Sequence, residues 1–299
     1  MREVVVLSGK GGTGKTSVVG AFAALAKQKV LSDCDVDAAD LHLLLSPTVK
    51  EEHEFWSGQA AVIDRAVCTE CGKCVEVCRF DAIHDFVVDP IGCEGCAFCS
   101  RICPVNAITM KDNMAGHWYI SETRFGPLVH AKLGIAQENS GKLVALVRQK
   151  AKEIAEQAGL EITINDGPPG IGCAVISSLS GANLACIVTE PSYSGIHDME
   201  RVGQLSRHFD IPAMICINKY DLNLEQTKKI EDLARETDIA VVGKISFDQV
   251  FTESMIQAKT IFEYDKDSRA SVEVRQVWNN ILSIPEFSTP GINIIVKHL

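Results

Sequence analysis

The chain has 299 residues, of which 46% are hydrophobic and 23% charged, and it carries a formal net charge of −10 at pH 7. This length accommodates one large core with a small additional module. The negative charge disfavours nucleic acid or an anionic membrane surface as the main partner. No apolar stretch approaches the ~18 residues that a membrane-spanning helix needs. Because the first residues read as a strand and not as a secretory signal, we expect a cytoplasmic protein.

Strands and helices are expected to alternate along the chain, except in a cysteine-rich segment near residues 62–115. Apolar runs predict strands at 3–7, 30–33, 161–165, 184–189, 213–218 and 240–245. Helical periodicity predicts helices at 16–29, 141–159, 195–209, 223–237 and 268–283. Short apolar strands joined by crossover helices indicate an α/β fold with a doubly wound, mostly parallel sheet. The tail from Pro285 onward shows no clear amphipathic pattern.

A glycine-rich segment follows the first predicted strand and precedes the first predicted helix. It consists of Gly9, Lys10, Gly11, Gly12, Thr13, Gly14, Lys15, Thr16 and Ser17. The pattern G-x-x-x-x-G-K-T in this context predicts a phosphate-binding loop, whose backbone N–H groups point at phosphate oxygens. Lys15 would then reach the β- and γ-phosphates, and the hydroxyl of Thr16 would ligate Mg²⁺. The alternative is a glycine-rich turn without a ligand.

Acidic residues follow two later strands. Asp33, Asp35, Asp37 and Asp40 lie around the end of the second strand, and Asp166 begins the segment Asp-Gly-Pro-Pro-Gly. Phosphoryl transfer depends on positioning and charge neutralisation, so carboxylates near the metal and the attacking water are expected. An aspartate that follows a strand also commonly caps a helix, and this alternative stays open.

A further polar motif, Asn218-Lys219-Tyr220-Asp221, follows the strand predicted at 213–218. Its position at the end of a parallel strand places it where a nucleotide base would lie. In GTPases an Asn-Lys-x-Asp motif reads guanine, so these letters alone leave GTP open.

Eight of the 12 cysteines form two runs of the same spacing, C-x-x-C-x-x-C-x-x-x-C. This spacing is that of bacterial ferredoxins, in which the fourth cysteine of each run ligates the other cluster. The pattern therefore predicts two [4Fe–4S] clusters, one held by Cys68, Cys71, Cys74 and Cys103, the other by Cys78, Cys93, Cys96 and Cys99. Zinc is the alternative, although zinc sites usually pair two C-x-x-C knuckles across a longer gap. A module this small should need its clusters in order to fold.

The second lysine of the glycine-rich loop, Lys10, points to a family. Lys-Gly-Gly-x-Gly-Lys-Thr resembles the deviant phosphate loop of the P-loop ATPases related to MinD, ParA and the nitrogenase iron protein (SIMIBI type). With the two cysteine runs, the chain resembles members of this superfamily that contain an inserted ferredoxin domain. The resemblance implies three segments: ATPase residues 1–61, a ferredoxin-like insertion 62–115, and ATPase residues 116–299.

The resemblance also implies roles for individual residues. The lysine at the position of Lys10 contacts the nucleotide of a partner subunit, so a homodimer around two ATP molecules is expected. Asp35 corresponds to a water-orienting or metal-linked aspartate, and Asp166 to the aspartate that holds the water shell of Mg²⁺. Asn218, with Lys219 and Asp221, would lie at the base, where this class contacts adenine. Lys10, Lys15, Asp35 and Asp166 form the expected catalytic set.

Cys173 lies seven residues after Asp166, where the nitrogenase iron protein carries a ligand of its inter-subunit cluster. That protein needs a second cysteine, and the segment 135–143 has none, so we expect a packed thiol near the second switch.

The leading hypothesis is an ATPase whose nucleotide-driven homodimer gates electron transfer through two [4Fe–4S] clusters, with a redox donor and acceptor that the sequence does not identify. The alternative is an ATP-dependent protein that assembles or carries iron–sulfur clusters. A third class, spatial positioning as in MinD or ParA, needs a membrane-binding helix or a basic face that binds DNA, and we find neither.

Overall fold

The computed structural model describes residues 1–134 and 140–284, which form two compact units. The first unit contains residues 1–51, 119–131 and those from 141 onward, and the second contains 52–118 and 132–140. The second unit thus begins before the expected boundary at 62 and extends beyond 115. The segment 135–139 and the tail from Pro285, about which the sequence made predictions, lie outside the described residues.

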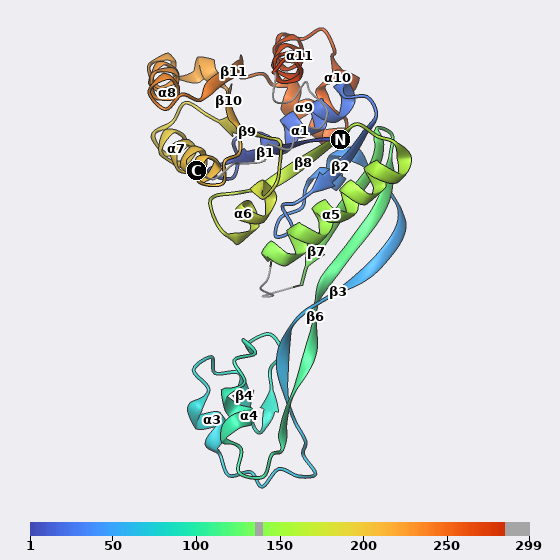
Figure 1. Ribbon diagram of the computed structural model, residues 1–299, viewed down its shortest axis with the longest axis vertical. Coiled ribbons are helices and arrows are strands. Elements are labelled where there is room, and N and C mark those ends of the chain that lie inside the picture. Colours follow the sequence, from blue (N-terminus) through green and yellow to red (C-terminus); the bar gives the residue numbers. More distant parts are fainter. Residues whose placement is uncertain (135–139, 285–299) are drawn as a thin grey trace, which may run out of the picture. The chain divides into compact units, whose positions relative to one another are not determined.

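The first unit is built on a sheet with the strand order β11-β10-β9-β1-β8-β2-β7-β6-β3. Its strands are β1 Arg2–Ser8, β2 Lys29–Asp33, β3 Thr48–Ile63, β6 Ile108–Thr123, β7 Gly126–Leu133, β8 Ile162–Pro169, β9 Leu184–Thr189, β10 Ala213–Asn218 and β11 Ala240–Ile245. β1 pairs in parallel with β8 and β9, and the strands from β11 to β7 are all parallel neighbours. This arrangement confirms the predicted doubly wound, mostly parallel sheet (Figure 1).

The strands β3, β6 and β7 of this sheet were not predicted from the sequence. β3 and β6 are both 16 residues long, are neighbours in the sheet order, and contribute residues to both units. Most of β3 is exposed, and it begins with Thr-Val-Lys-Glu-Glu-His-Glu. Apolar periodicity detects strands that face a core, so a largely exposed and charged strand leaves no such pattern.

Helices cover both faces of the sheet. They are α1 Lys15–Leu25, α2 Leu41–Leu45, α5 Ser140–Ala158, α6 Cys173–Leu179, α7 Tyr193–His208, α8 Leu224–Glu236, α9 Val250–Ile256, α10 Ile261–Tyr264 and α11 Arg269–Leu282, with a 3₁₀ turn at Tyr220–Leu222. Successive side chains of β1 alternate between the faces: Val4 and Val6 join the core under α1 and α11, while Val5 and Leu7 join that under α6, α7 and α8. Within the described residues, no helix is both long and apolar enough to span a membrane.

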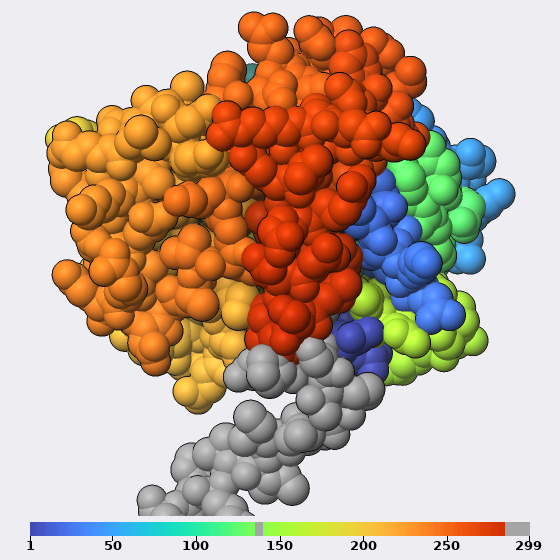
Figure 2. Space-filling model, turned by 90° about the horizontal axis from the view of Figure 1, so that it is seen from above, coloured from blue at the N-terminus to red at the C-terminus, as the bar shows by residue number. Residues whose placement is uncertain are grey.

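The first and last of the predicted helices compare differently with the structure. The helix predicted at 16–29 ends at Leu25, because Gln28 has a left-handed backbone and Lys29 already begins β2. α11 closely follows its predicted range and buries one face, including Val274 and Trp278, against β11 and α1. Figure 2 shows its outer side, in red, at the surface of this unit.

The second unit repeats one backbone pattern twice. α3 (Lys73–Val77) and α4 (Phe98–Ile102) each begin after a residue in the left-handed region, Gly72 and Ala97, and each end directly before the fourth cysteine of a run. Asp81 and Asn106, three residues after those cysteines, both have positive φ. The hairpin of β4 (Ile83–His84) and β5 (Val87–Val88) follows the first half. The repeat seen in the sequence is therefore also a repeat of backbone conformation.

Candidate functional site

The glycine-rich loop connects β1 to α1 at the carboxyl edge of the sheet. Gly12 and Gly14 have φ of 80° and 89°, a region that side chains with a Cβ rarely adopt. A Cβ on Gly14 would also lie 2.4 Å from the side-chain nitrogen of Asn218. The amide of Asn218 donates to the carbonyl of Thr13 at 2.7 Å. The end of β10 therefore supports the loop directly, and only glycine fits at position 14.

Lys15 lies among buried carboxylates. Its ammonium is 2.5 Å from Oδ1 of Asp166, in the second half of β8, and 3.6 Å from Oδ2 of Asp35. Burial alone would lower the pKa of Lys15, but the charge and hydrogen bond of Asp166, helped by Asp35 and Asp33, outweigh burial and raise that pKa. The structure thus brings together the lysine and both aspartates that the sequence selected from three distant segments.

The aspartates at the end of β2 and after it differ in burial: Asp33 is buried, Asp35 is half-buried, and the later two are exposed. Asp33 is fully buried and accepts hydrogen bonds from the backbone N–H groups of Asp35 and Leu41, both at 3.1 Å, so it shapes the turn into α2. Burial is the main reason why the pKa of Asp35 is raised to about 6. The charge and hydrogen bond of Lys15 oppose this rise, and the nearby charges of Asp166 and Asp37 add to it. Asp37 and Asp40 are exposed.

Two oxygen atoms near the loop have no hydrogen-bond partner. Oδ2 of Asp166 and Oγ1 of Thr13 are both buried within the described part of the chain and unpartnered. Buried polar atoms are normally satisfied, so these oxygens fit a polar ligand at this position. Thr16 follows Lys15 directly in α1 and is half-buried. Thr16, Asp35 and Asp166 therefore provide oxygen donors of the type that Mg²⁺ prefers.

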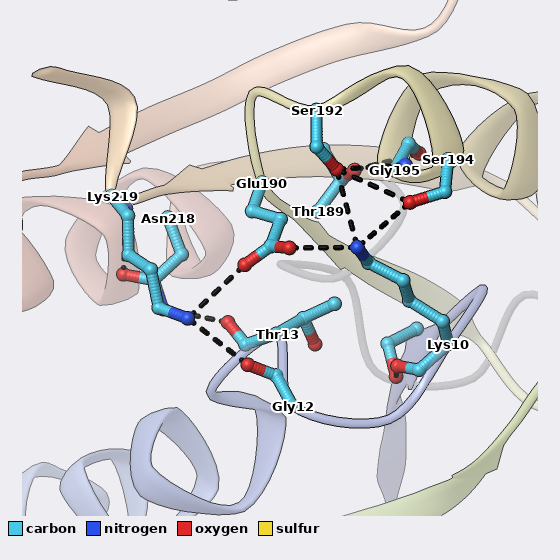
Figure 3. A network of polar contacts seen from close by, with 11 residues as sticks. Lys10, Gly12, Thr13, Thr189, Glu190, Ser192, Ser194, Gly195, Asn218 and Lys219 are labelled. Carbon is cyan, nitrogen blue, oxygen red and sulfur yellow. Dashed lines mark hydrogen bonds and ion pairs between the residues drawn. The ribbon is translucent and has the colours of Figure 1, made fainter. Parts of the chain in front are cut away.

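Lysines from the loop and from the end of β10 converge on Glu190, which follows β9 (Figure 3). The ammonium of Lys10 is 2.7 Å from Oε1 of Glu190, and that of Lys219 is 3.1 Å from Oε2. Lys219 also donates to the carbonyl of Gly12 at 3.0 Å. Asp221, the last residue of the Asn-Lys-x-Asp motif, instead accepts a hydrogen bond from the backbone N–H of Phe247 at 2.7 Å.

The sequence did not identify Glu190 as a functional residue. The position of Glu190 in the sequence could have indicated it: Glu190 is an acidic residue that directly follows an apolar strand. The parallel neighbours of this strand end at the same edge of the sheet. Ser192 and Ser194, which accept hydrogen bonds from Lys10 at 3.2 and 2.9 Å, were missed for the same reason. Such contacts follow from the order of the strands in the sheet, which no local motif encodes.

The eight cysteines of the two runs line two separate cavities of the second unit. One cavity is lined by Cys68, Cys71, Cys74 and Cys103, the other by Cys78, Cys93, Cys96 and Cys99. Each cavity thus combines three cysteines of one run with the last cysteine of the other. Among the residues that the structure describes, no three His, Cys, Asp or Glu side chains are placed to hold a single metal ion.

Backbone amides face the sulfur atoms at equivalent places in both halves. The N–H of Ala82 donates to Sγ of Cys78 at 3.4 Å, and that of Ala107 to Sγ of Cys103 at 3.3 Å. Hydrogen bonds of this kind tune iron–sulfur clusters. Burial raises the pKa of the third cysteine of each run, Cys74 and Cys99. The two halves therefore offer matching thiol environments.

Cys173 corrects one expectation. We expected a packed thiol, but Cys173 is exposed, because it is the first residue of α6 and follows the turn after Asp166. The other three cysteines outside the two runs, Cys34, Cys186 and Cys216, are buried in the first unit.

Comparison with known proteins places the chain in a family. The family model described as the CobQ/CobB/MinD/ParA nucleotide binding domain matches residues 4–261. The chain belongs to this family. An uncharacterized protein of Methanocaldococcus jannaschii is 31% identical over 282 residues, which cover 93% of this chain and 96% of that protein.

Solved structures agree with this assignment at the level of the fold. The septum site-determining protein MinD of Pyrococcus horikoshii, determined in complex with Mg-ADP, matches 94% of this chain and 95% of its own, with a TM-score of 0.57 and 17% identity. A shorter likeness concerns a different kind of protein: Ferredoxin 7Fe of Hydrogenibacillus schlegelii is 35% identical over 69 residues, or 21% of this chain and 88% of the ferredoxin.

Proposed function

We propose that the protein is an ATP-hydrolysing switch that carries two [4Fe–4S] clusters and controls electron transfer through them. The observation that carries this proposal is the pair of cavities in the second unit, each lined by four cysteines in the crossed combination of bacterial ferredoxins. A cubane needs one thiolate for each of its four irons, and each cavity supplies four. When bound, the clusters would supply one-electron redox chemistry.

The nucleotide site supports the other half of the proposal. A triphosphate in the loop would take over the ammonium of Lys15, which now pairs with Asp166 at 2.5 Å. Asp166 would then be free to hold the water shell of Mg²⁺, and Thr16 would bind the ion directly. Asp35 would orient the water that attacks the γ-phosphorus, so that ATP and water give ADP and phosphate. As the resemblance to the MinD class implies, adenine would lie beside Asn218, at the end of β10.

Lys10 supports a dimer as the active form. It lies in a loop that already has Lys15 for its own phosphates, so a second lysine can serve the nucleotide of another copy. The proposed homodimer would hold two ATP molecules between its subunits, as the resemblance to the MinD class implies.

The chain itself links the switch to the second unit. Asp33 holds the start of α2 through the N–H of Leu41, and β3 begins at Thr48, shortly after α2 ends at Leu45. β3 then continues without a break into the second unit. A change at Asp35 that depends on the γ-phosphate would therefore act on a continuous segment of chain that leads through α2 and β3 to the cysteines.

Cysteine variants test the clusters and their crossed ligation. Anaerobically purified protein should contain about 8 irons per chain, and Cys74→Ser should reduce this to about 4. Cys68→Ser combined with Cys103→Ser, which share a cavity, should also leave about 4, whereas Cys68→Ser combined with Cys78→Ser should leave none. Cys173→Ser is the control and should retain all of the iron. Equal losses in the two double variants would contradict the crossed assignment.

Electron transfer tests the coupling. The reduced holoprotein is mixed with a one-electron dye, and oxidation is followed by the visible absorbance of the clusters with ATP, with ADP and without nucleotide. We expect the rate to depend on ATP in the wild type and not in Lys15→Met. Equal rates under all three conditions would reject gating while leaving the cluster assignment intact. Transfer of iron to an apo-ferredoxin at a comparable rate would instead favour the cluster-carrier function.

A further inference from the structure

The ammonium of Lys10 is fully engaged within its own subunit. It contacts Oε1 of Glu190 at 2.7 Å, Oγ of Ser194 at 2.9 Å and Oγ of Ser192 at 3.2 Å (Figure 3). An ammonium group has three N–H donors, and three acceptors surround this one. We call these four residues the Lys10 cluster. A lysine that is to reach a second copy must first leave all three of these partners.

We propose that Glu190 retains Lys10 in its own subunit, and that it competes for this lysine with the nucleotide of a second copy. The inference rests on the proposed ATP-dependent dimer and adds the residue that opposes it. Glu190 would act through Lys10 and is therefore a positioning residue, with no contact to the reacting atoms.

The acceptors of the Lys10 cluster are held by a tight turn between β9 and α7. Ser192 caps α7 by accepting from the N–H of Gly195 at 3.1 Å, and Thr189 donates to the carbonyl of Gly195 at 2.9 Å. A Cβ on Gly195 would lie 2.4 Å from the carbonyl oxygen of Glu190, so the turn requires glycine there. The acceptors are therefore in place before Lys10 binds, and little entropy is lost when it does.

The phosphate loop is packed against the same helix. A Cβ on Gly9 would lie 2.2 Å from Cβ of Asp198, in the second turn of α7. This close approach fixes the start of the loop beside the Lys10 cluster. The contact between Lys10 and Glu190 thus follows from the packing of two ordered segments.

Glu190 is shared with a second lysine that belongs to the nucleotide site. Its other carboxylate oxygen, Oε2, accepts from Lys219 at 3.1 Å, and Lys219 donates to the carbonyl of Gly12 in the loop. Burial would raise the pKa of Glu190, but the hydrogen bonds from Lys10 and Lys219 outweigh it and lower that pKa. Glu190 is therefore ionised at neutral pH and holds two cations with one carboxylate.

Because Glu190 also binds Lys219, its hold on Lys10 should depend on whether nucleotide is bound. A nucleotide beside Asn218 would meet Lys219 and the Gly12 carbonyl, and so disturb the contacts that orient Glu190. The polyphosphate of a second copy would then offer Lys10 more negative charge than a single carboxylate does. Without nucleotide, Glu190 keeps Lys10, and the subunits stay apart.

Glu190→Gln tests this inference, because it preserves the shape of the side chain and removes its charge. Dimerisation of the anaerobic holoprotein is measured by sedimentation velocity with Mg²⁺ and a non-hydrolysable ATP analogue. The loss of one partly exposed lysine–carboxylate pair changes an equilibrium constant by about fivefold. Because a dimer releases two lysines, one from each subunit, Glu190→Gln should have a dissociation constant about 25-fold lower than that of the wild type. Ser194→Ala, which removes one neutral acceptor, should lower the dissociation constant less.

The matched control is Glu225→Gln. Glu225 forms an exposed pair with Lys229 on α8, at 2.8 Å, outside the Lys10 cluster, and its loss should leave the dissociation constant unchanged. If the wild type dimerises and Glu190→Gln dimerises no more tightly, the retention is refuted and the proposed function stands. If Glu190→Gln dimerises and the wild type does not, the result would support the retention of Lys10 by Glu190 strongly. If neither protein dimerises with nucleotide, the proposed dimer fails and the retention fails with it.

Discussion

A buried ion pair joins α5 to β1 in the first unit. Arg148 on α5 and Glu3 on β1 are 5% and 1% exposed. Nε and Nη2 of Arg148 both lie 2.8 Å from Oε1 of Glu3. The guanidinium also donates to the carbonyls of Ser177 and Ser180, at the end of α6. Arg148→Met should therefore leave a buried carboxylate and two carbonyl groups without their main donor.

The expected loss of stability follows from the surroundings of Glu3. Removing one partner of a buried ion pair costs about 3–5 kcal/mol of unfolding free energy. Lys152 remains 2.8 Å from Oε2 of Glu3, and Asn165 donates to Oε1 at 2.6 Å, so the lower end of this range applies. A loss of about 3 kcal/mol corresponds to a fall of about 6–12 °C in the melting temperature of a domain of this size.

Thermal unfolding followed by far-UV circular dichroism measures this loss. Lys150→Ala is the matched control, because Lys150 pairs with Glu153 on the more exposed side of the same helix, and its loss should cost less than about 1 kcal/mol. Glu3→Gln combined with Arg148→Met should recover part of the stability, since no buried charge is then left alone. A melting temperature for Arg148→Met equal to that of Lys150→Ala would refute this reasoning.

Three further predictions concern the two sites. Burial above all raises the pKa of Asp35 to about 6, so the folded state binds an extra proton below that pH. The unfolding free energy of the wild type should therefore fall as the pH rises from about 4 to about 7. Chemical denaturation at several pH values should show a smaller fall for Asp35→Asn than for the wild type. Asn218→Ala removes the buried hydrogen bond that supports the loop at Thr13, so ATP binding measured by calorimetry should weaken about tenfold. The control Asn279→Ala, on the exposed side of α11, should leave ATP binding unchanged. Chelation of the iron should make residues 52–118 sensitive to protease while the first unit resists, and equal resistance before and after chelation would contradict the role of the clusters in folding.

The features that the sequence determined by itself are those encoded in neighbouring residues. The phosphate loop, the two cysteine runs and the strands at 213–218 and 240–245 could be read directly, because their spacing or apolar character is local. The crossed sets of cysteines also follow from spacing. In the structure each of the two cavities is lined by one of these predicted sets of four cysteines. The strands β3 and β6 could not be read, since they lack an apolar face along much of their length.

Only the tertiary structure decided which distant residues meet. Glu190 lies beside Lys10 and Lys219 because β9 lies between β1 and β10 in the sheet, and no local pattern encodes that order. The pairing of Arg148 with Glu3 likewise depends on how α5 packs against β1. The exposure of Cys173 depends on where α6 begins. Strand order is set by burial of the whole sheet, a property of the complete chain, and the contacts that restrain Lys10 follow from it.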